Sequence, residues 1–260
     1  MRVFANDLKS LWNYHCFVIV VGVWLEKNMI LSLNPELSLR IQEVPVDWSP
    51  DDLRAIEATG GSALKIRLSR EILNKLTIDA FGNAGLFQSL LLSTIKEAGL
   101  KEEQTSCTTI NNMDFYEGAA LKVAEQLDGL YQSFARRVAN GIRKRKRATG
   151  IYSHLMAVIV NFENSKLMTP IPFFDVYNAA HQREARIIQG NLKTVLDKVA
   201  DLQVDENGRG LVFTFDGENI LVVDRNILFY KKYCTVNWPW EQIILESKDQ
   251  GYQEELDFNS

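Results

Sequence analysis

The segment 17–40, FVIVVGVWLEKNMILSLNPELSLR, constrains the fold of this chain more than any other stretch. Residues 17–23 are continuously apolar and rich in β-branched side chains, which is typical of a strand buried on both faces of a parallel sheet. A turn and a short helix follow, and Arg40 then stands directly before 41–46, a second candidate strand. This order predicts an α/β protein.

Most of the remaining chain is predicted to be helical, with apolar residues at helical spacing. One helix is expected to begin after Ser49 as its cap, with Pro50 at the first helical position, and to end at Gly60 and Gly61. The other helices are expected over residues 3–14, 69–80, 85–97, 114–140, 151–162, 171–180 and 191–200. Residues 211–215 and 220–223 flank a turn sequence and predict a β-hairpin, and 227–233 is expected to be a third strand.

Composition narrows the class of protein. The chain has 260 residues with 46% hydrophobic and 24% charged content, enough for one sizeable core or two small ones. The apolar run 16–25 is too short to span a bilayer, no signal peptide is evident, and the 3 cysteines have no CxxC spacing. We therefore expect a cytoplasmic protein with no membrane partner, no disulfides and no metal site.

The sequence contains no phosphate-binding loop. The pattern GxxxxGK[ST] has no match, and no strand ending in paired acids precedes the first helix. We therefore do not expect this chain to hydrolyse ATP by itself.

The segment after those missing motifs nevertheless resembles AAA+ and STAND-type P-loop ATPases. Residues 19–22 resemble their fourth core strand, and Glu26 and Asn28 occupy the loop that senses the nucleotide in the family. Arg40, after the short helix, resembles the arginine offered to a neighbouring subunit's nucleotide, a task that suits a planar, permanent cation. The alternatives are a plain surface loop and an arginine that forms only a salt bridge.

The resemblance extends to the helical lid of these ATPases. Residues 44–49 resemble the entry to the lid, and 81–86 (FGNAGL) resemble its conserved turn. The family implies a nucleotide contact for Asn83, although Gly-Asn is also ordinary turn chemistry, and Gly85 stands where many members have an arginine. ATP and Mg²⁺ are the cofactors that the resemblance implies for a full-length member, whereas this chain alone is expected to bind neither.

A basic run and a possible winged helix suggest nucleic acid as an alternative partner. Helices followed by a hairpin predict a winged helix with 191–200 as recognition helix, and Lys193 would face a groove together with Asn191, Thr194 and Lys198. Phosphate contacts are further expected from Arg209 and from the run Arg143, Lys144, Arg145, Lys146 and Arg147. The acids Asp197, Asp201, Asp205 and Glu206 in the same region favour a protein-contact module, and the run is equally compatible with a solvated surface. Trp238 and Trp240 are expected to anchor the tail.

The sequence thus predicts an α/β, mostly helical chain with an incomplete P-loop ATPase core. The expected division is a partial core over 1–48, a helical lid over 49–99, a helical region with the basic loop over 100–163, and a winged-helix-like domain with an acidic tail over 164–260. The predicted function is that of the C-terminal portion of an AAA+/STAND-like ATP-binding regulator, a nucleotide-dependent switch. A complete ATPase subunit or a second copy would be its partner. A DNA-binding winged-helix protein and a protein-interaction adaptor remain as alternatives.

Overall fold

The computed structural model describes residues 2–11, 14, 17–22, 30–31, 34–44, 48–140, 150–206 and 210–246. The protein is mostly helical, as predicted, with two small sheets in the described part. It divides into two units, Met1–Asp47 and Trp48–Ser260. None of the helices in the described residues combines the length and the apolar content that crossing a membrane requires.

The unit Met1–Asp47 contains helix α1 (Arg2–Leu11) and the 3₁₀ helix η2 (Pro35–Leu37). Ala5, Ile30 and Leu37 form its small core. The amide of Asn34, a buried side chain, donates to the backbone oxygen of Ala5 at 3.3 Å and so joins η2 to α1. The predicted helix over 3–14 is therefore confirmed over most of its length.

The two strands predicted in this unit are wrong in their described parts. Residues 17–22 and 41–44 are not strands, and the side chains of Phe17, Ile19 and Val21 are at least 90% exposed. A strand that is apolar on both faces needs neighbouring strands and covering helices, and no such sheet is present in the described residues of this unit. The sequence pattern indicated a local preference for β-strand, but it could not show whether neighbouring strands are present to pair with.

The unit Trp48–Ser260 begins with helices and a pair of short parallel strands. These elements are α3 (Pro50–Leu64), β1 (Ile66–Leu68), α4 (Arg70–Asp79), α5 (Ala84–Glu97) and β2 (Thr108–Ile110). Ser49 caps α3 in a capping box with Asp52, and Pro50 stands at its first turn, as predicted. β2 lies in a segment for which the sequence predicted neither a helix nor a strand, and its Ile110 pairs with Leu68 of β1.

Gly60 and Gly61 do not end α3, which contradicts the prediction. The helix continues to Leu64, and Lys65 then adopts the left-handed conformation at φ 54°. A Cβ on Gly61 would lie 2.5 Å from the backbone oxygen of Ile66, so this glycine permits β1 to fold back closely against the helix. The glycine marks a close approach of the backbone and not a C-cap.

The rest of this unit contains the long helix α6 and the elements that follow it. Their bounds are α6 (Met113–Asn140), α7 (Ile151–Asn161), α8 (Asn164–Leu167), β3 (Ile171–Pro172), α9 (Phe173–Arg183), α10 (Gln189–Gln203), β4 (Phe213–Phe215), β5 (Asn219–Val222) and α11 (Asn226–Tyr233). The helices predicted over 114–140, 151–162 and 191–200 and the hairpin are confirmed. The helix predicted over 171–180 begins two residues later, because residues 171 and 172 form β3.

β3, β5 and β4 form an antiparallel sheet in that order, so the first strand lies against the second strand of the hairpin. The third strand predicted over 227–233 is wrong, because these residues form helix α11. Its apolar run Ile227–Tyr230 is fully buried, and such a short buried run does not distinguish a strand from a helix. Both indoles of the segment 238–240 are buried and stack at 4.5 Å, which confirms the predicted anchoring of the segment.

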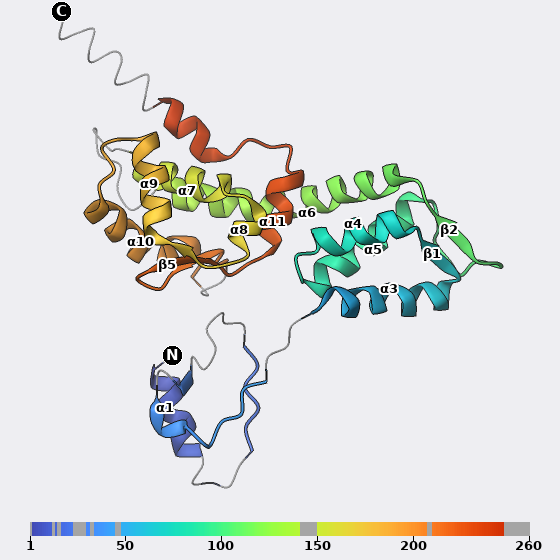
Figure 1. Ribbon diagram of the computed structural model, residues 1–260, viewed down its shortest axis with the longest axis horizontal. Coiled ribbons are helices and arrows are strands. Elements are labelled where there is room, and N and C mark those ends of the chain that lie inside the picture. Colours follow the sequence, from blue (N-terminus) through green and yellow to red (C-terminus); the bar gives the residue numbers. More distant parts are fainter. Residues whose placement is uncertain are drawn as a thin grey trace, which may run out of the picture. The chain divides into compact units, whose positions relative to one another are not determined.

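Helix α6 connects the elements that precede it in this unit, α3 to β2, with those that follow it, α7 to α11 (Figure 1). Its 28 residues span about 42 Å, and it packs on α4 and α5 as well as on α7, α10 and α11. A single hydrophobic cluster extends from Leu53 to Ile244 and includes residues on both sides of the predicted boundary between 163 and 164, such as Val160 and Leu167. Segments 48–140 and 150–246 therefore share one core.

Candidate functional site

Arg40 is exposed in the turn that follows η2. Its backbone N–H donates to the oxygen of Leu37 at 3.0 Å. A hydrogen bond and the charge of Lys9 hold the pKa of the Glu36 carboxyl below its ordinary value, and Arg40 adds a smaller electrostatic contribution. Arg40 therefore lies at the surface of the unit Met1–Asp47, and its predicted role stays a prediction.

Several predicted site residues lie outside the described residues. These are Glu26, Asn28, Arg209 and the basic run Arg143, Lys144, Arg145, Lys146 and Arg147. Their roles remain predictions.

Asn83 is the N-cap of α5. Its side-chain oxygen accepts from the N–H of Leu86 at 3.1 Å, and its amide donates to the side-chain oxygen of Asn226 at 2.9 Å. Both polar atoms of Asn83 therefore hold the turn and attach it to α11. The adjacent cavity, which Ser89 and Gln126 also line, has a volume of about 190 Å³, below the roughly 300 Å³ at which small-molecule pockets usually begin.

The backbone before Asn83 is unusual. Phe81 and Gly82 both have positive φ, at 47° and 74°, and Phe81 adopts the left-handed region although it has a side chain. The Nη1 atom of Arg225 lies 3.5 Å from the place of a Cβ on Gly82. The structure therefore brings the turn 80–83 against Arg225 and Asn226, and the bonded residues Asn83 and Asn226 are 143 positions apart in the chain.

Close to this turn, a buried carboxylate joins three helices. Asp79 is fully buried at the end of α4 and accepts hydrogen bonds from the hydroxyls of Tyr116 (2.7 Å) and Tyr233 (2.5 Å) and from the ammonium of Lys232 (2.7 Å). The ammonium of Lys75 lies 3.4 Å from the same carboxylate. These five residues, the Asp79 cluster, connect α4 to α6 and α11.

The electrostatics of the Asp79 cluster favour a charged carboxylate. Burial alone would raise the pKa of Asp79, but the hydrogen bonds from Lys232, Tyr233 and Tyr116 outweigh it and lower the pKa. Burial and the hydrogen bond to Asp79 raise the pKa of Tyr233 to about 12, and burial also raises the pKa of Tyr116. The neighbouring Lys232 ammonium, together with burial, lowers the pKa of Lys75. Near neutral pH the cluster therefore holds a carboxylate between protonated hydroxyls.

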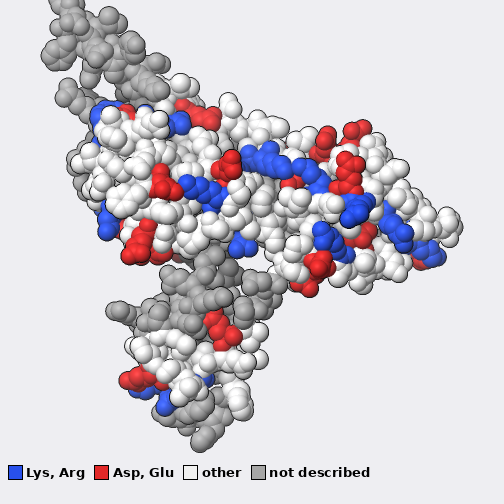
Figure 2. Space-filling view, viewed as in Figure 1, with Lys and Arg blue, Asp and Glu red and all other residues white. Residues whose placement is uncertain are grey.

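The exposed face of α10 has mixed charge. Lys193, Thr194, Asp197, Lys198 and Asp201 are exposed, so two cations and two anions share this face. Basic and acidic side chains are likewise interspersed on the side of the molecule seen in Figure 2.

Asn191 does not face outward as predicted. Its oxygen accepts from the N–H of Ile188 at 3.0 Å, and its amide donates to the oxygen of Arg186 at 3.1 Å. A side chain at the third position of a helix is well placed to satisfy backbone groups before the helix. Asn191 therefore stabilises the start of α10.

Gln203 fixes the end of α10 to the hairpin. It is fully buried, its side-chain oxygen accepts from the N–H groups of Val212 (2.9 Å) and Phe213 (2.7 Å), and its amide donates to the oxygen of Phe213 (2.8 Å). Two guanidinium nitrogens of Arg137, near the end of α6, donate to the backbone oxygen of Gln203 at 3.2 and 2.6 Å. The side-chain amide of Gln203 thus joins α10 to the hairpin, and its backbone oxygen joins α10 to α6.

Comparison with known proteins does not assign this chain to a family. No protein family, curated protein or solved structure matches this chain. Among the described residues there is no group of three or more His, Cys, Asp or Glu side chains that could hold a metal ion.

The sequence prediction did not include Asp79 or Gln203, although the pattern contained a signal for both. Asp79 shares the apolar stripe of Ile72 and Leu76, and Gln203 continues the stripe of α10 at positions 192, 195, 196 and 199. A polar residue on an apolar stripe predicts a buried, hydrogen-bonded group. Its partners, however, lie on helices distant in sequence.

Proposed function

We propose that this chain is the C-terminal portion of an AAA+/STAND-like ATP-binding regulatory protein. In this proposal residues 49–99 are the helical lid, residues 164–260 are a winged-helix-like domain, and Arg40 acts on the nucleotide of a complete ATPase subunit. The nucleotide state of that subunit would move the lid, and the lid would move the winged helix. The chain by itself does not hydrolyse ATP, because its sequence has no GxxxxGK[ST].

The order of elements after residue 150 supports the winged helix. Helix α7 and the four-residue helix α8 are followed by a short strand (β3), two helices (α9 and α10) and a hairpin (β4 and β5). β3 pairs with β5, which gives the sheet order β3-β5-β4. A winged helix has this arrangement, with the second helix of the pair as its recognition helix.

The observation that carries the regulatory part of the proposal is the contact between the turn after α4 and the helix after the hairpin. Asn83 bonds to Asn226, and Asp79 accepts from Lys232 and Tyr233, so α11 is attached to the lid-like helices at both ends. α11 follows β5 directly, after only three residues. A displacement of the lid-like helices would therefore be transmitted to the hairpin.

Nucleotide binding tests the absence of a phosphate site. We expect no saturable binding of a fluorescent ATP analogue, with magnesium, by the purified chain. Saturable binding would contradict the proposal that the nucleotide belongs to another subunit.

The role of Arg40 is tested on the ATPase subunit that co-purifies with this chain. Adding the wild-type chain should raise the rate of ATP hydrolysis, whereas Arg40→Ala should not, because the permanent cation at the transferring phosphoryl group is removed. Arg54→Ala is the matched control, since Arg54 is a partly exposed arginine of the other unit that pairs with Asp51. Equal stimulation by all three proteins would refute the role of Arg40.

DNA binding is the second candidate function, and the exposure of Lys193, Thr194 and Lys198 on α10 favours it. We expect salt-dependent binding to duplex DNA, in which each phosphate that a cation of the protein neutralises adds about 0.9 to the slope of log affinity against log salt. Substitution of Arg143, Arg145 and Arg147 by Ala should reduce this slope, whereas the same substitution of the exposed Lys96, Lys101 and Lys122 should not. No binding at low salt would refute this candidate.

A further inference from the structure

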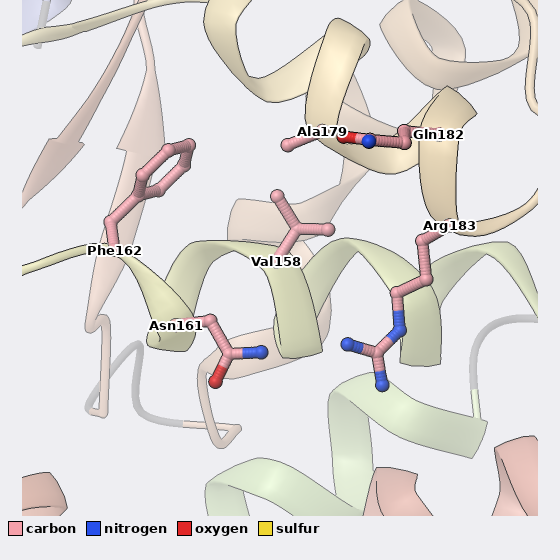
Figure 3. A pocket seen from close by; sticks show the side chains of 6 residues that line it. All are labelled: Val158, Asn161, Phe162, Ala179, Gln182 and Arg183. Carbon is pink, nitrogen blue, oxygen red and sulfur yellow. The ribbon is translucent and has the colours of Figure 1, made fainter.

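A groove lies between α7 and α9, apart from every residue discussed above as a candidate for nucleotide or DNA binding. Its volume is about 370 Å³, and it is lined by Val158, Asn161, Phe162, Ala179, Gln182 and Arg183. Figure 3 shows Ala179 of α9 above Val158 of α7, with the ring of Phe162 toward one end and the guanidinium of Arg183 toward the other. The groove therefore has an apolar middle, an aromatic end and a cationic end.

The polar side chains of this groove have no partner within the described part of the chain. Those of Asn161, Gln182 and Arg183 form no hydrogen bond or ion pair with another described residue, and all three are exposed. They offer a guanidinium and two carboxamides to a ligand. A guanidinium binds carboxylates and phosphates through paired hydrogen bonds, and a carboxamide can bind peptide groups.

The nearby acids of α9 are already paired with other cations, so they do not neutralise Arg183. Glu184, the next residue, accepts two hydrogen bonds at 2.9 Å from the guanidinium of Arg186, which lowers the pKa of Glu184 to about 2. Asp175, at the other end of α9, pairs with Lys166 at 2.7 Å. Within the described residues no acid forms an ion pair with Arg183, so its positive charge favours an anionic ligand.

The two lysines near the aromatic end already have partners, since Lys166 pairs with Asp175 and Lys231 donates to backbone oxygens. The ammonium of Lys166 lies 4.7 Å from the centroid of the Phe162 ring, and the ammonium of Lys231 donates to the backbone oxygen of Phe162 at 2.5 Å. Lys166 and Lys231 are thus held by groups of the protein itself, and among the described residues of the groove Arg183 is the cation that remains for a ligand. The ligand that fits has a negative charge beside an apolar group.

We propose that the α7–α9 groove is the docking site for an acidic peptide segment of a partner protein, in which a leucine or phenylalanine stands beside carboxylates. One carboxylate pairs with Arg183, peptide groups bond to Asn161 and Gln182, and the apolar side chain covers Val158 and Ala179. A nucleic acid fits less well, because its phosphodiester backbone has no apolar group to cover this floor. The proposal is independent of the proposed function, since none of its residues contacts Asn83 or the Asp79 cluster in the interactions described above.

The test is fluorescence anisotropy with the full chain and the labelled peptide Asp-Glu-Phe-Glu-Leu-Asp. We expect saturable binding, and a loss of affinity of at least about tenfold in Arg183→Gln, since a charge-assisted pair is removed. Ala179→Gln, which fills the floor, should weaken binding similarly. Arg67→Gln makes the same chemical change on β1 and should bind as the wild type does. The uncharged peptide with Gln and Asn should not bind.

A charge exchange keeps the result independent of folding defects. Arg183→Glu should lose the acidic peptide and gain affinity for the version with Lys at the acidic positions. The proposal is wrong if the wild type does not bind the acidic peptide, if Arg183→Gln binds it unchanged, or if a duplex oligonucleotide displaces it from the groove.

Discussion

Replacing Asp79 with asparagine tests the Asp79 cluster, because the change preserves size but removes charge. Oδ1 of Asp79 accepts a hydrogen bond from the ammonium of Lys232, and Oδ2 accepts hydrogen bonds from the hydroxyls of Tyr116 and Tyr233. An amide has only one acceptor oxygen, so in Asp79→Asn its NH₂ group faces either the ammonium or the tyrosines.

The smallest cost arises when the oxygen stays on the tyrosine side. Lys232 then turns toward water, and because its side chain is 36% exposed, the broken ion pair is worth no more than about 1 kcal/mol. The two hydroxyl bonds change from charge-assisted to neutral, which removes about 0.5–1 kcal/mol each. We therefore expect the free energy of unfolding to fall by about 1–3 kcal/mol.

Urea unfolding followed by circular dichroism measures this change. Asp197→Asn on the exposed face of α10 is the matched control and should stay within about 0.5 kcal/mol of the wild type. The effects of Asp79→Asn and Tyr116→Phe should be non-additive, since the two residues are bonded to each other. A loss below about 0.5 kcal/mol in Asp79→Asn would refute the assignment of a stabilising role to this cluster.

Three further predictions concern stability. Because folding lowers the pKa of Asp79, its carboxylate stabilises the protein above the unfolded pKa of about 3.9, and this stabilisation is lost as the pH falls through the folded pKa. The difference in the free energy of unfolding between the wild type and Asp79→Asn, measured by urea unfolding at several pH values, should therefore shrink below about pH 4. Gly60→Ala should raise the melting temperature, since its Cβ would meet nothing within 4 Å and a glycine inside a helix costs about 0.5–1 kcal/mol relative to alanine. Gly61→Ala should lower the melting temperature, because its Cβ would clash with the backbone oxygen of Ile66. Equal shifts of the melting temperature in the two variants would contradict this reasoning. Gln203→Leu should destabilise by about 2–4 kcal/mol in urea unfolding, because the N–H groups that it binds become unsatisfied, and a loss below about 1 kcal/mol would contradict its role.

Sequence patterns predicted the elements that are determined by interactions between residues close in the chain. The capping box at Ser49, the cap at Ser69 and the hairpin around Gly217 are formed as the residues themselves dictate. The apolar stripe and length of α6 likewise sufficed for its prediction, because a long helix has many residues that report the same period.

What could not be predicted depends on residues distant in sequence. The exposure of Ile19 reflects the lack of partner strands in the described residues, and the helical state of 227–233 reflects burial among helices on several sides. The bond from Asn83 to Asn226 and the convergence of Asp79 with Tyr233 require knowledge of tertiary structure. Sequence patterns identify a buried polar residue, but its partner is determined by how the helices pack.

Native-state hydrogen exchange tests most directly the central claim that helices α4 and α5 form one body with helices α9 and α10 and the hairpin. The slowest amides of α4 and α5 should have the same opening free energy as those of α9 and α10, and Asp79→Asn should lower all of them by the same amount. This result would mean that a movement of one group of helices is transmitted to the other. If α4 and α5 open at a lower free energy, and Asp79→Asn changes only these helices, the two groups unfold independently and the proposed transmission is wrong.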